Sequence, residues 1–161
     1  MAMFTAEFEF KVDRKGRISV PADYRSTLAH DSYSGIVLIP VEGERALDGF
    51  GNERLESLAE ALDDPDLYDD EDELELAKQY FAKARRIPFD GDGRIVLPVE
   101  IRKHAGITDA AIYVGGGNTF RLWHPTAYEA HKERLEAKAR TRVKPVPLRL
   151  KPRKRKPEAE Q

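Results

Sequence analysis

The pattern of hydrophobic and polar positions runs twice through the same series of short elements. In the first series Phe8, Phe10 and Val12 alternate with polar residues, and a period of two is typical of a half-buried strand. A polar turn follows, and then a β-branched run that stops at a proline able to open a short helix. The pattern therefore predicts two similar units, each with a strand, a turn, a second strand and a helix.

The two turns match residue for residue at a fixed spacing. Residues 13–21 and 90–98 share Asp, Gly, Arg, Ile and Pro at an offset of 77 residues, and Arg25 and Arg102 keep the same offset. The glycine of each copy stands where a tight turn requires positive φ. The match indicates a duplicated hairpin, although repetition alone does not say what the hairpins bind.

The remaining pattern predicts helices and further strands around these hairpins. We expect helices over residues 22–28, 53–62, about 70–86, 99–104 and 125–140, and strands over residues 36–40, about 46–47, 111–114 and 119–123. In the last helix Tyr128 and Leu135 are expected to face inward, so that this helix caps the fold.

These elements predict an α+β fold with flanking helices. We divide the chain into a first unit (1–62), an acidic linker with a connecting helix (63–86), a second unit (87–140) and a basic tail (141–161). The tail alternates proline with Lys and Arg, a composition that predicts disorder when the tail is alone. With 161 residues the chain is long enough to bury a real core.

The small net charge of −2 conceals a strong asymmetry. Residues 1–137 carry 17 of the 27 Lys and Arg residues and 27 of the 29 acids, a net charge of −10, whereas residues 138–156 hold ten cations and no acid. Any contact of the body with nucleic acid must therefore come from local basic patches, because the body as a whole would be repelled by phosphate.

The first turn is the strongest candidate for such a patch. Arg14, Lys15 and Arg17 place three cations within five residues, and arginine can bind phosphate oxygens or the O6 and N7 atoms of guanine. The second turn has only Arg94, with Asp92 in place of a lysine, and is expected to be the weaker contact. Either turn taken alone is also explained as a charged, solvated loop.

Two further basic segments are possible secondary DNA contacts. Arg85 and Arg86 close the predicted helix 70–86, where cations equally complement the helix dipole. Arg153, Lys154 and Arg155 lie in the tail, which would either hold DNA non-specifically or lie against the acidic body. The sequence leaves both alternatives open for each segment.

No motif for catalysis or metal binding stands out. The chain has no cysteine, which excludes disulfides and thiolate zinc sites and favours a cytoplasmic setting. The acidic run 63–73 lacks the register of a calcium-binding loop, and the glycines at 115–117 are not followed by the Lys-Ser/Thr of a phosphate loop. We expect no enzyme activity, no cofactor, no metal and no small-molecule substrate. No apolar run reaches membrane length, so we expect no membrane partner.

These residues resemble the MraZ family, bacterial transcription regulators of the division and cell wall gene cluster. The resemblance spans about residues 4–140 and lies in Asp13–Arg17 with Pro21 and Arg25, in Asp90–Arg94 with Pro98 and Arg102, and in residues 105–107 and 114–123. The chain departs from the family at Phe4-Thr5-Ala6, where Phe-x-Gly is common, around residues 49–51, and in its longer basic tail.

The resemblance implies two tandem AbrB-like swapped-hairpin units that form one pseudo-twofold, barrel-like β core. It also implies a ring-shaped homo-oligomer at the nucleoid that binds short direct repeats in double-stranded promoter DNA. Matching residue by residue places the DNA-reading loop on Asp13, Lys15, Gly16 and Arg17, with Arg94 as the counterpart in the second loop. The alternative is an antitoxin-like or scaffold protein that shares the fold and binds protein.

Overall fold

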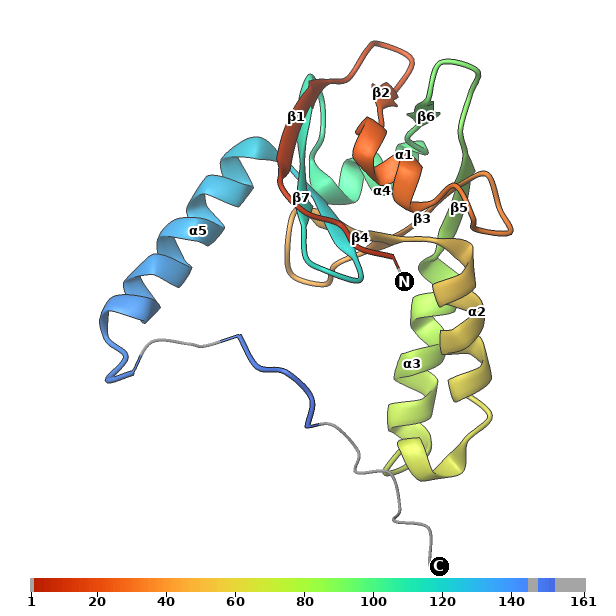
Figure 1. Cartoon of the computed structure of the whole chain (residues 1–161), viewed down its shortest axis with the longest axis vertical. Helices are drawn as coiled ribbons and strands as arrows, with labels where there is room; N and C mark the ends of the chain where they lie inside the picture. Colours follow the sequence, from red (N-terminus) through yellow and green to blue (C-terminus); the bar gives the residue numbers. More distant parts are fainter. Residues whose placement is uncertain (1, 145–147, 153–161) are drawn as a thin grey trace, which may run out of the picture.

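The computed structural model describes residues 2–144 and 148–152 and has the predicted α+β fold (Figure 1). The strands are β1 (Glu7–Lys11), β2 (Arg17–Ser19), β3 (Gly35–Pro40), β4 (Ala46–Phe50), β5 (Arg85–Pro88), β6 (Arg94–Val96), β7 (Ala110–Gly115) and β8 (Phe120–Trp123). The helices are α1 (Ala22–Thr27), α2 (Asn52–Ala61), α3 (Glu71–Lys83), α4 (Val99–Ala105) and α5 (Pro125–Arg140), with a 3₁₀ turn η1 (Pro65–Leu67) between α2 and α3.

Six strands form one antiparallel sheet in the order β1-β7-β8-β4-β3-β5, and β2 pairs with β6 in a separate two-stranded ribbon. The sheet is open, because β1 and β5 are its two edges and no closed barrel is formed by the residues that the structure describes. The barrel-like core expected from the resemblance is therefore corrected to an open sheet with a ribbon across it.

The two halves of the chain contribute equivalent strands, β1–β4 and β5–β8. Exchanging each strand for its counterpart in the other half gives the same sheet order in reverse. β1 pairs with β7 and β5 pairs with β3, so the first strand of each half lies beside the third strand of the other half. The central contact joins β4 to β8, and the ribbon joins β2 to β6. The duplicated sequence pattern is thus matched by a duplicated pattern of strand pairing.

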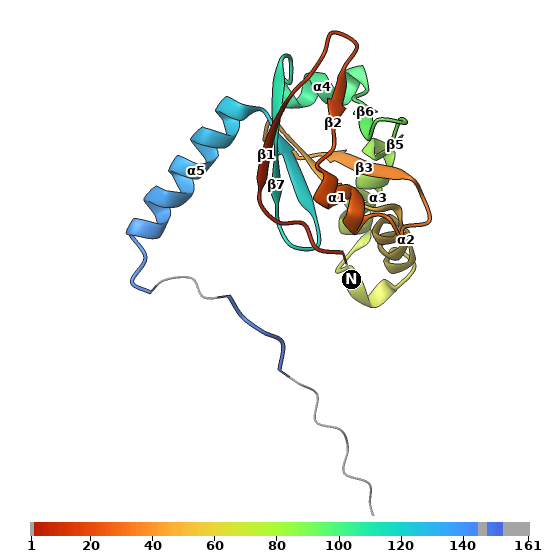
Figure 2. The same cartoon turned by 45° about the horizontal axis from the view of Figure 1, so that its top comes forward.

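The main core lies between the sheet and a layer made of α1, α4 and the β2–β6 ribbon (Figures 1 and 2). Tyr24 of α1 is its centre: its ring meets Phe4 at 5.1 Å and Tyr113 at 5.8 Å between centroids, in edge-to-face geometry. Ile18 and Ile95 close the core from the ribbon and are almost fully buried. This packing holds the two hairpins on one shared base.

Two predicted helices differ from the structure. The helix expected to reach residue 86 ends at Lys83, and Arg85 and Arg86 instead lie on β5, paired with Leu38 and Val37 of β3. Pairing with a buried strand outweighs local helix propensity here, since each paired residue satisfies its backbone groups in the sheet. The Arg85 side chain nevertheless complements the end of α3, because its Nη1 donates to the carbonyls of Ala82 at 3.1 Å and Ala84 at 3.0 Å.

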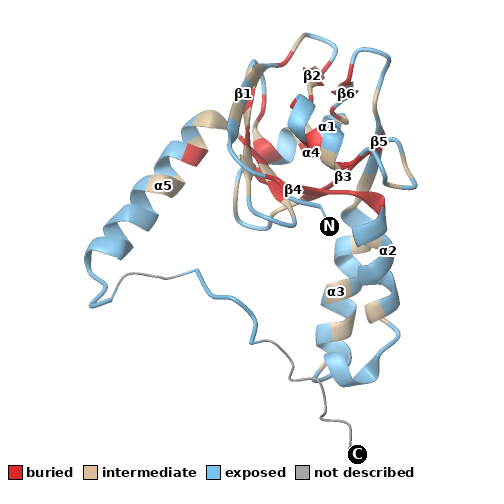
Figure 3. Ribbon diagram, in the orientation of Figure 1, coloured by how far each residue is buried: buried red, intermediate tan, exposed pale blue. Residues whose placement is uncertain are grey.

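The second difference concerns α5, which does not cap the fold. Tyr128 near its start is buried as predicted, but Leu135 is 52% exposed. Figure 3 shows that α5 is exposed along most of its length and points away from the body, as does the α2–α3 pair. The burial of α5 is thus confined to its first turns.

Candidate nucleic-acid interface

The turn between β1 and β2 is built around the carboxylate of Asp13. Its Oδ1 accepts hydrogen bonds from the backbone N–H groups of Lys15 and Arg17, each at 2.9 Å. Its Oδ2 accepts from Nε of Arg17 at 2.5 Å. Gly16 has φ of +82°, which allows the chain to reverse without a strained side chain. We call residues 13–17 the first tip.

The turn between β5 and β6 repeats this geometry, and we call residues 90–94 the second tip. Asp90 Oδ1 accepts from the N–H groups of Asp92 at 2.8 Å and Arg94 at 2.9 Å, and Gly93 has φ of +72°. Asp90 Oδ2 accepts from Nε of Arg94 at 3.0 Å. The shared Asp and Gly thus have a structural role in both tips: they fix the loop that presents the cations.

These hydrogen bonds also determine the ionisation of the two aspartates. The N–H of Arg17, more than any other group, lowers the pKa of the Asp13 carboxyl below its ordinary value, and the N–H of Arg94 lowers the pKa of Asp90 in the same way. Both carboxylates therefore lose their charge at a lower pH than an unperturbed aspartate does.

The two tips differ in the charge that they present. Arg14 and Lys15 are exposed in the first tip, and the Arg17 side chain is 35% exposed. In the second tip Arg94 is held by two carboxylates, Asp90 at 3.0 Å and Asp92 at 3.2 Å. The first tip is therefore a net cationic surface, whereas the only cation of the second tip is already paired with acids.

Backbone hydrogen bonds join each tip to the strand end of the other half of the chain. The N–H of Val20 donates to the carbonyl of Gly93 at 3.1 Å, and the N–H of Leu97 donates to the carbonyl of Gly16 at 2.8 Å. Both tips lie at the same end of the molecule, above β2 and β6 in Figure 1. Their spacing is thus fixed by backbone hydrogen bonds.

Two further arginines reach the tips, and sequence reasoning did not assign them to the site. A side chain at Gly93 would lie 2.7 Å from the Arg25 guanidinium carbon, and one at Gly16 would lie 2.8 Å from Nη1 of Arg102. Each arginine thus covers the glycine of the tip that belongs to the other half of the chain. The sequence did indicate that these two arginines belong to the repeated hairpins, because Arg25 and Arg102 share the 77-residue offset of the tips.

Arg85 and Arg86, two of the residues expected as secondary contacts, do not lie at the tips. Arg85 begins β5, at the end of the strand remote from Asp90, and donates to Glu100 at 2.9 Å. The Arg86 guanidinium lies 5.8 Å from the ring centroid of Tyr33. Arg153, Lys154 and Arg155 lie outside the described residues.

Metal clusters and membrane-spanning helices are absent from the part of the chain that the structure describes. No group of three or more His, Asp or Glu side chains there is placed to hold a metal ion. No described helix is long and apolar enough to cross a bilayer. Gly115 and Gly116 belong to the β7–β8 hairpin, where the N–H of Gly116 donates to the carbonyl of Thr119 at 2.8 Å.

Comparison with known proteins gives consistent matches over most of the chain. The family model described as "MraZ protein, putative antitoxin-like" matches residues 3–43 and 80–145. A protein of Rhodospirillum rubrum named transcriptional regulator MraZ is 41% identical over 137 residues, which cover 83% of this chain and 87% of the relative. Proteins of the same name from Pelagibacter ubique and Rickettsia akari are 33% and 34% identical, over 85% and 81% of this chain and 88% and 87% of their own lengths.

Proposed function

Because the chain belongs to the MraZ family, we propose that it is a regulator of transcription that binds DNA. The observation that carries the proposal is the pair of hairpin tips at one end of the molecule, one of which presents Arg14, Lys15 and Arg17 together. A narrow cationic projection on an otherwise acidic body favours contact with phosphates and base edges at the tip alone.

In this proposal each residue of the first tip has a distinct part. Arg14 and Lys15 are exposed and bind phosphate oxygens, whereas Arg17 reads a base edge. The carboxylate of Asp13 holds the Arg17 side chain at one angle, which reduces the rotamer entropy lost on binding. Gly16 supplies the turn, and Arg25 and Arg94 contribute at the second tip.

The second tip is a weaker contact, so affinity for DNA has to come from several copies acting together. We propose that the two halves are swapped-hairpin units, consistent with their exchanged strand pairing, and that the chain assembles into a ring. A ring presents many equal tips, and direct repeats spaced to match them add their modest contacts through effective concentration. The proposed targets are promoters of the division and cell wall gene cluster, read at the nucleoid in the cytoplasm.

The test begins with DNA fragments of the source organism's genome selected on the full-length protein. The enriched fragments are expected to share a short direct repeat. Against that repeat, Arg17→Ala should weaken binding by about 1–3 kcal/mol per engaged tip and reduce the preference for the selected sequence. Binding is measured by gel shift and by fluorescence anisotropy.

The matched control is Arg45→Ala, which removes an exposed arginine of the β3–β4 turn and should leave DNA affinity unchanged. Unaltered sequence preference in Arg17→Ala would overturn the assignment of the reading residue. If no repeat is enriched at all, DNA recognition itself is wrong, and the antitoxin-like or scaffold alternative takes its place.

A further inference from the structure

The outer face of the β2–β6 ribbon is the surface between the two tips (Figure 1). The ribbon is antiparallel, with Arg17 opposite Val96 and Ser19 opposite Arg94, and these four side chains share one face. The isoleucine between them on each strand points the other way and is buried in the core. The outer face therefore begins at the first tip with Arg17 and Val96 and ends at the second tip with Ser19 and Arg94.

Val96 lies directly beside Arg17 on this face. The N–H of Leu97 donates to the carbonyl of Gly16 at 2.8 Å, which makes those two residues a hydrogen-bonded pair. Because hydrogen-bonded and non-hydrogen-bonded pairs alternate along an antiparallel ladder, Arg17 and Val96 form a non-hydrogen-bonded pair. The Cβ atoms of directly opposed residues are about 4.5–5.5 Å apart, and they are closest in pairs of this kind. Val96 is thus the cross-strand neighbour of the arginine proposed to read a base.

The two ends of this face carry the same arginine but different neighbours. The 77-residue offset relates Arg17 to Arg94 and Ser19 to Val96. Arg17 therefore has a valine beside it, whereas Arg94 has a serine. The face is apolar only at the end of the ribbon that adjoins the cationic first tip.

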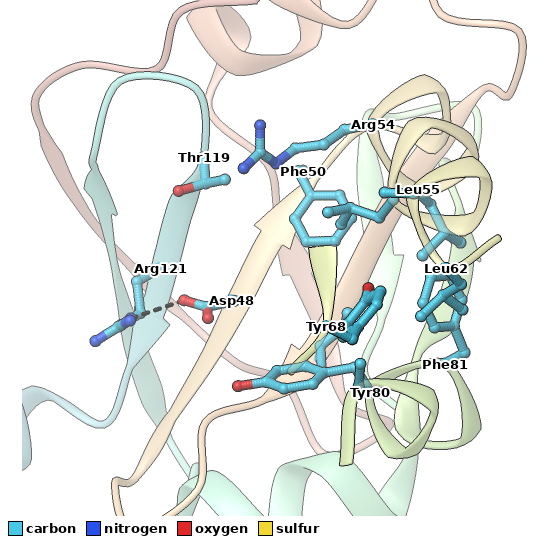
Figure 4. Close-up of a pocket in the computed structure, with 14 residues that line it drawn as sticks. Asp48, Phe50, Arg54, Leu55, Leu62, Tyr68, Tyr80, Phe81, Thr119 and Arg121 are labelled. Carbon is cyan, nitrogen blue, oxygen red and sulfur yellow. Dashed lines mark hydrogen bonds and ion pairs between the residues drawn. The ribbon is translucent and has the colours of Figure 1, made fainter. Parts of the chain in front are cut away.

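Val96 exposes an apolar side chain on a strand. It is 50% exposed, and no other strand within residues 2–144 carries an exposed large hydrophobic side chain. Two exposed apolar residues of the helices, Leu58 and Tyr80, instead line a groove of about 420 Å³ between the α2–α3 hairpin and strands β4 and β8 (Figure 4). A single exposed valine is ordinary on a protein surface, so its exposure matters here because of its position beside Arg17.

The major groove of DNA presents the groups that such a pair of side chains can read. The groove admits a two-stranded β-ribbon, and guanine offers its O6 and N7 atoms there, whereas thymine offers its C5 methyl group. Arginine binds the two guanine atoms together, and an apolar side chain contacts the methyl group. The Cβ separation across the ribbon is slightly larger than the rise of about 3.4 Å between successive base pairs, so the two side chains suit neighbouring base pairs.

We propose that Val96 is a specificity-determining residue that contacts the C5 methyl group of a thymine next to the base pair read by Arg17. Its counterpart Ser19 offers no methyl group and lies beside an arginine that is already paired with Asp90 and Asp92. The target repeat is then expected to hold a guanine and a thymine in adjacent base pairs. The inference deepens the proposed function and rests on it, because it states what the ribbon face recognises.

The test removes the methyl group from the DNA. Each thymine of the selected repeat is replaced in turn by uracil, which differs from thymine only in lacking the C5 methyl group. Binding of the full-length protein is measured by fluorescence anisotropy. One replacement, next to the guanine on which the loss in Arg17→Ala depends, should weaken binding by about fourfold per engaged tip, because one buried methyl contact is lost.

The matching change in the protein is Val96→Ser, which gives this position the residue of the other half of the chain. This variant should bind the thymine and uracil duplexes equally, because the methyl group then has no apolar partner. Val96→Thr keeps the branched shape and one methyl group, so it should retain most of the uracil effect. Circular dichroism and thermal unfolding verify that each variant is folded.

The control is Leu67→Ser, which removes a 57% exposed apolar side chain from η1, far from the tips (Figure 1). It should leave the ratio of thymine to uracil affinities as in the wild type. The ratio is the deciding measurement, because any change that affects all duplexes alike cancels in it.

Two outcomes would overturn the inference. One is that no thymine of the repeat responds to uracil, and the other is that Val96→Ser keeps the wild-type ratio, which would mean that the valine only stabilises the ribbon. A protein that gives either result but loses sequence preference in Arg17→Ala keeps the proposed function. If no repeat is selected, the proposed function fails and this inference fails with it, so the two failures are distinguishable.

Discussion

Single residues fix the geometry of the tips. Asp13 and Asp90 each accept two backbone N–H groups and one arginine side chain, and the adjacent glycines allow the reversal. Backbone hydrogen bonds also close both turns, from the N–H of Gly16 to the carbonyl of Asp13 at 3.0 Å and from the N–H of Gly93 to the carbonyl of Asp90 at 3.2 Å, and together these bonds position the cations. The recurring Asp and Gly are thus explained by loop structure, and the DNA contacts proposed here lie on the residues beside them.

The titration of Asp13 tests this account of the tip. Its pKa is lowered mainly by the N–H of Arg17, so its stabilising contribution is present above the unfolded pKa and is lost only as pH falls through the lowered, folded pKa. Carboxyl-carbon NMR should show titration below the ordinary value of 3.8. Arg17→Ala keeps the backbone bonds and should retain part of the shift. A titration at or above 3.8 would contradict the tip geometry.

Ala6 is the residue at which this chain departs from the family's Phe-x-Gly, and it has φ of +66°. Its carbonyl accepts from the Tyr24 hydroxyl at 3.2 Å and from the N–H of Gly115 at 2.9 Å, so the backbone cannot relax without losing both bonds. A side chain in this left-handed region is strained, and glycine is not.

Ala6→Gly should therefore raise the free energy of unfolding by about 1 kcal/mol. The measurement is urea or thermal unfolding of the full chain. Ala130→Gly, at an exposed position in the interior of α5, is the matched control and should lower stability by about 1 kcal/mol, as glycine does in a helix. Equal effects of the two changes would show that Ala6 is not strained.

At the scale of elements, contact with the rest of the fold decides what the local pattern leaves open. β5 forms at Arg85 because β3 offers a buried partner strand, although the preceding residues favour helix. α5 keeps its helical structure over its full length, yet residues 133–140 are exposed, and Arg134 reaches Glu44 of the β3–β4 turn at 3.6 Å. Its local stability therefore depends strongly on its cap and its own side-chain pairs.

The cap of α5 is His124, whose Nδ1 accepts from the N–H groups of Thr126 at 3.1 Å and Ala127 at 3.3 Å. His124→Ala removes this acceptor and should lower stability by about 1 kcal/mol, with loss of helical circular dichroism. His124→Asp restores an acceptor at the same place and should recover most of the loss. If Ala and Asp behave alike, the histidine contributes by packing and not by capping.

At the scale of the whole molecule, charge is separated between regions. The acidic hairpin of α2 and α3 (residues 52–83), the cationic first tip and the basic residues 138–144 occupy different parts of the structure (Figure 1). Binding to phosphate is then confined to a few cations on a body that repels DNA. The slope of log affinity against log salt is therefore proportional to the number of those cations that contact phosphate.

Lys15→Ala should accordingly weaken binding to all DNA sequences alike. The slope of log affinity against log salt should fall in magnitude by about one per engaged tip. Lys78→Ala, on the acidic hairpin, is the control and should leave the slope unchanged. The measurement is a salt titration of binding to specific and random duplexes, and an unaltered slope in Lys15→Ala would contradict a phosphate contact.

The amino-acid sequence by itself determined the two hairpin tips, most of the helices and strands, and the family. These features rest on interactions between residues close in the chain, such as Asp13 with Arg17, or on periodic patterns within one element. The tertiary structure alone decided the open sheet, the start of β5, the projection of α5 and the placement of Arg25 and Arg102 over the opposite tips. Those features depend on strands and side chains far apart in the chain, whose meeting is set by packing of the core. The shared offset of Arg25 and Arg102 marks the two arginines as equivalent, but it does not say which tip each of them reaches.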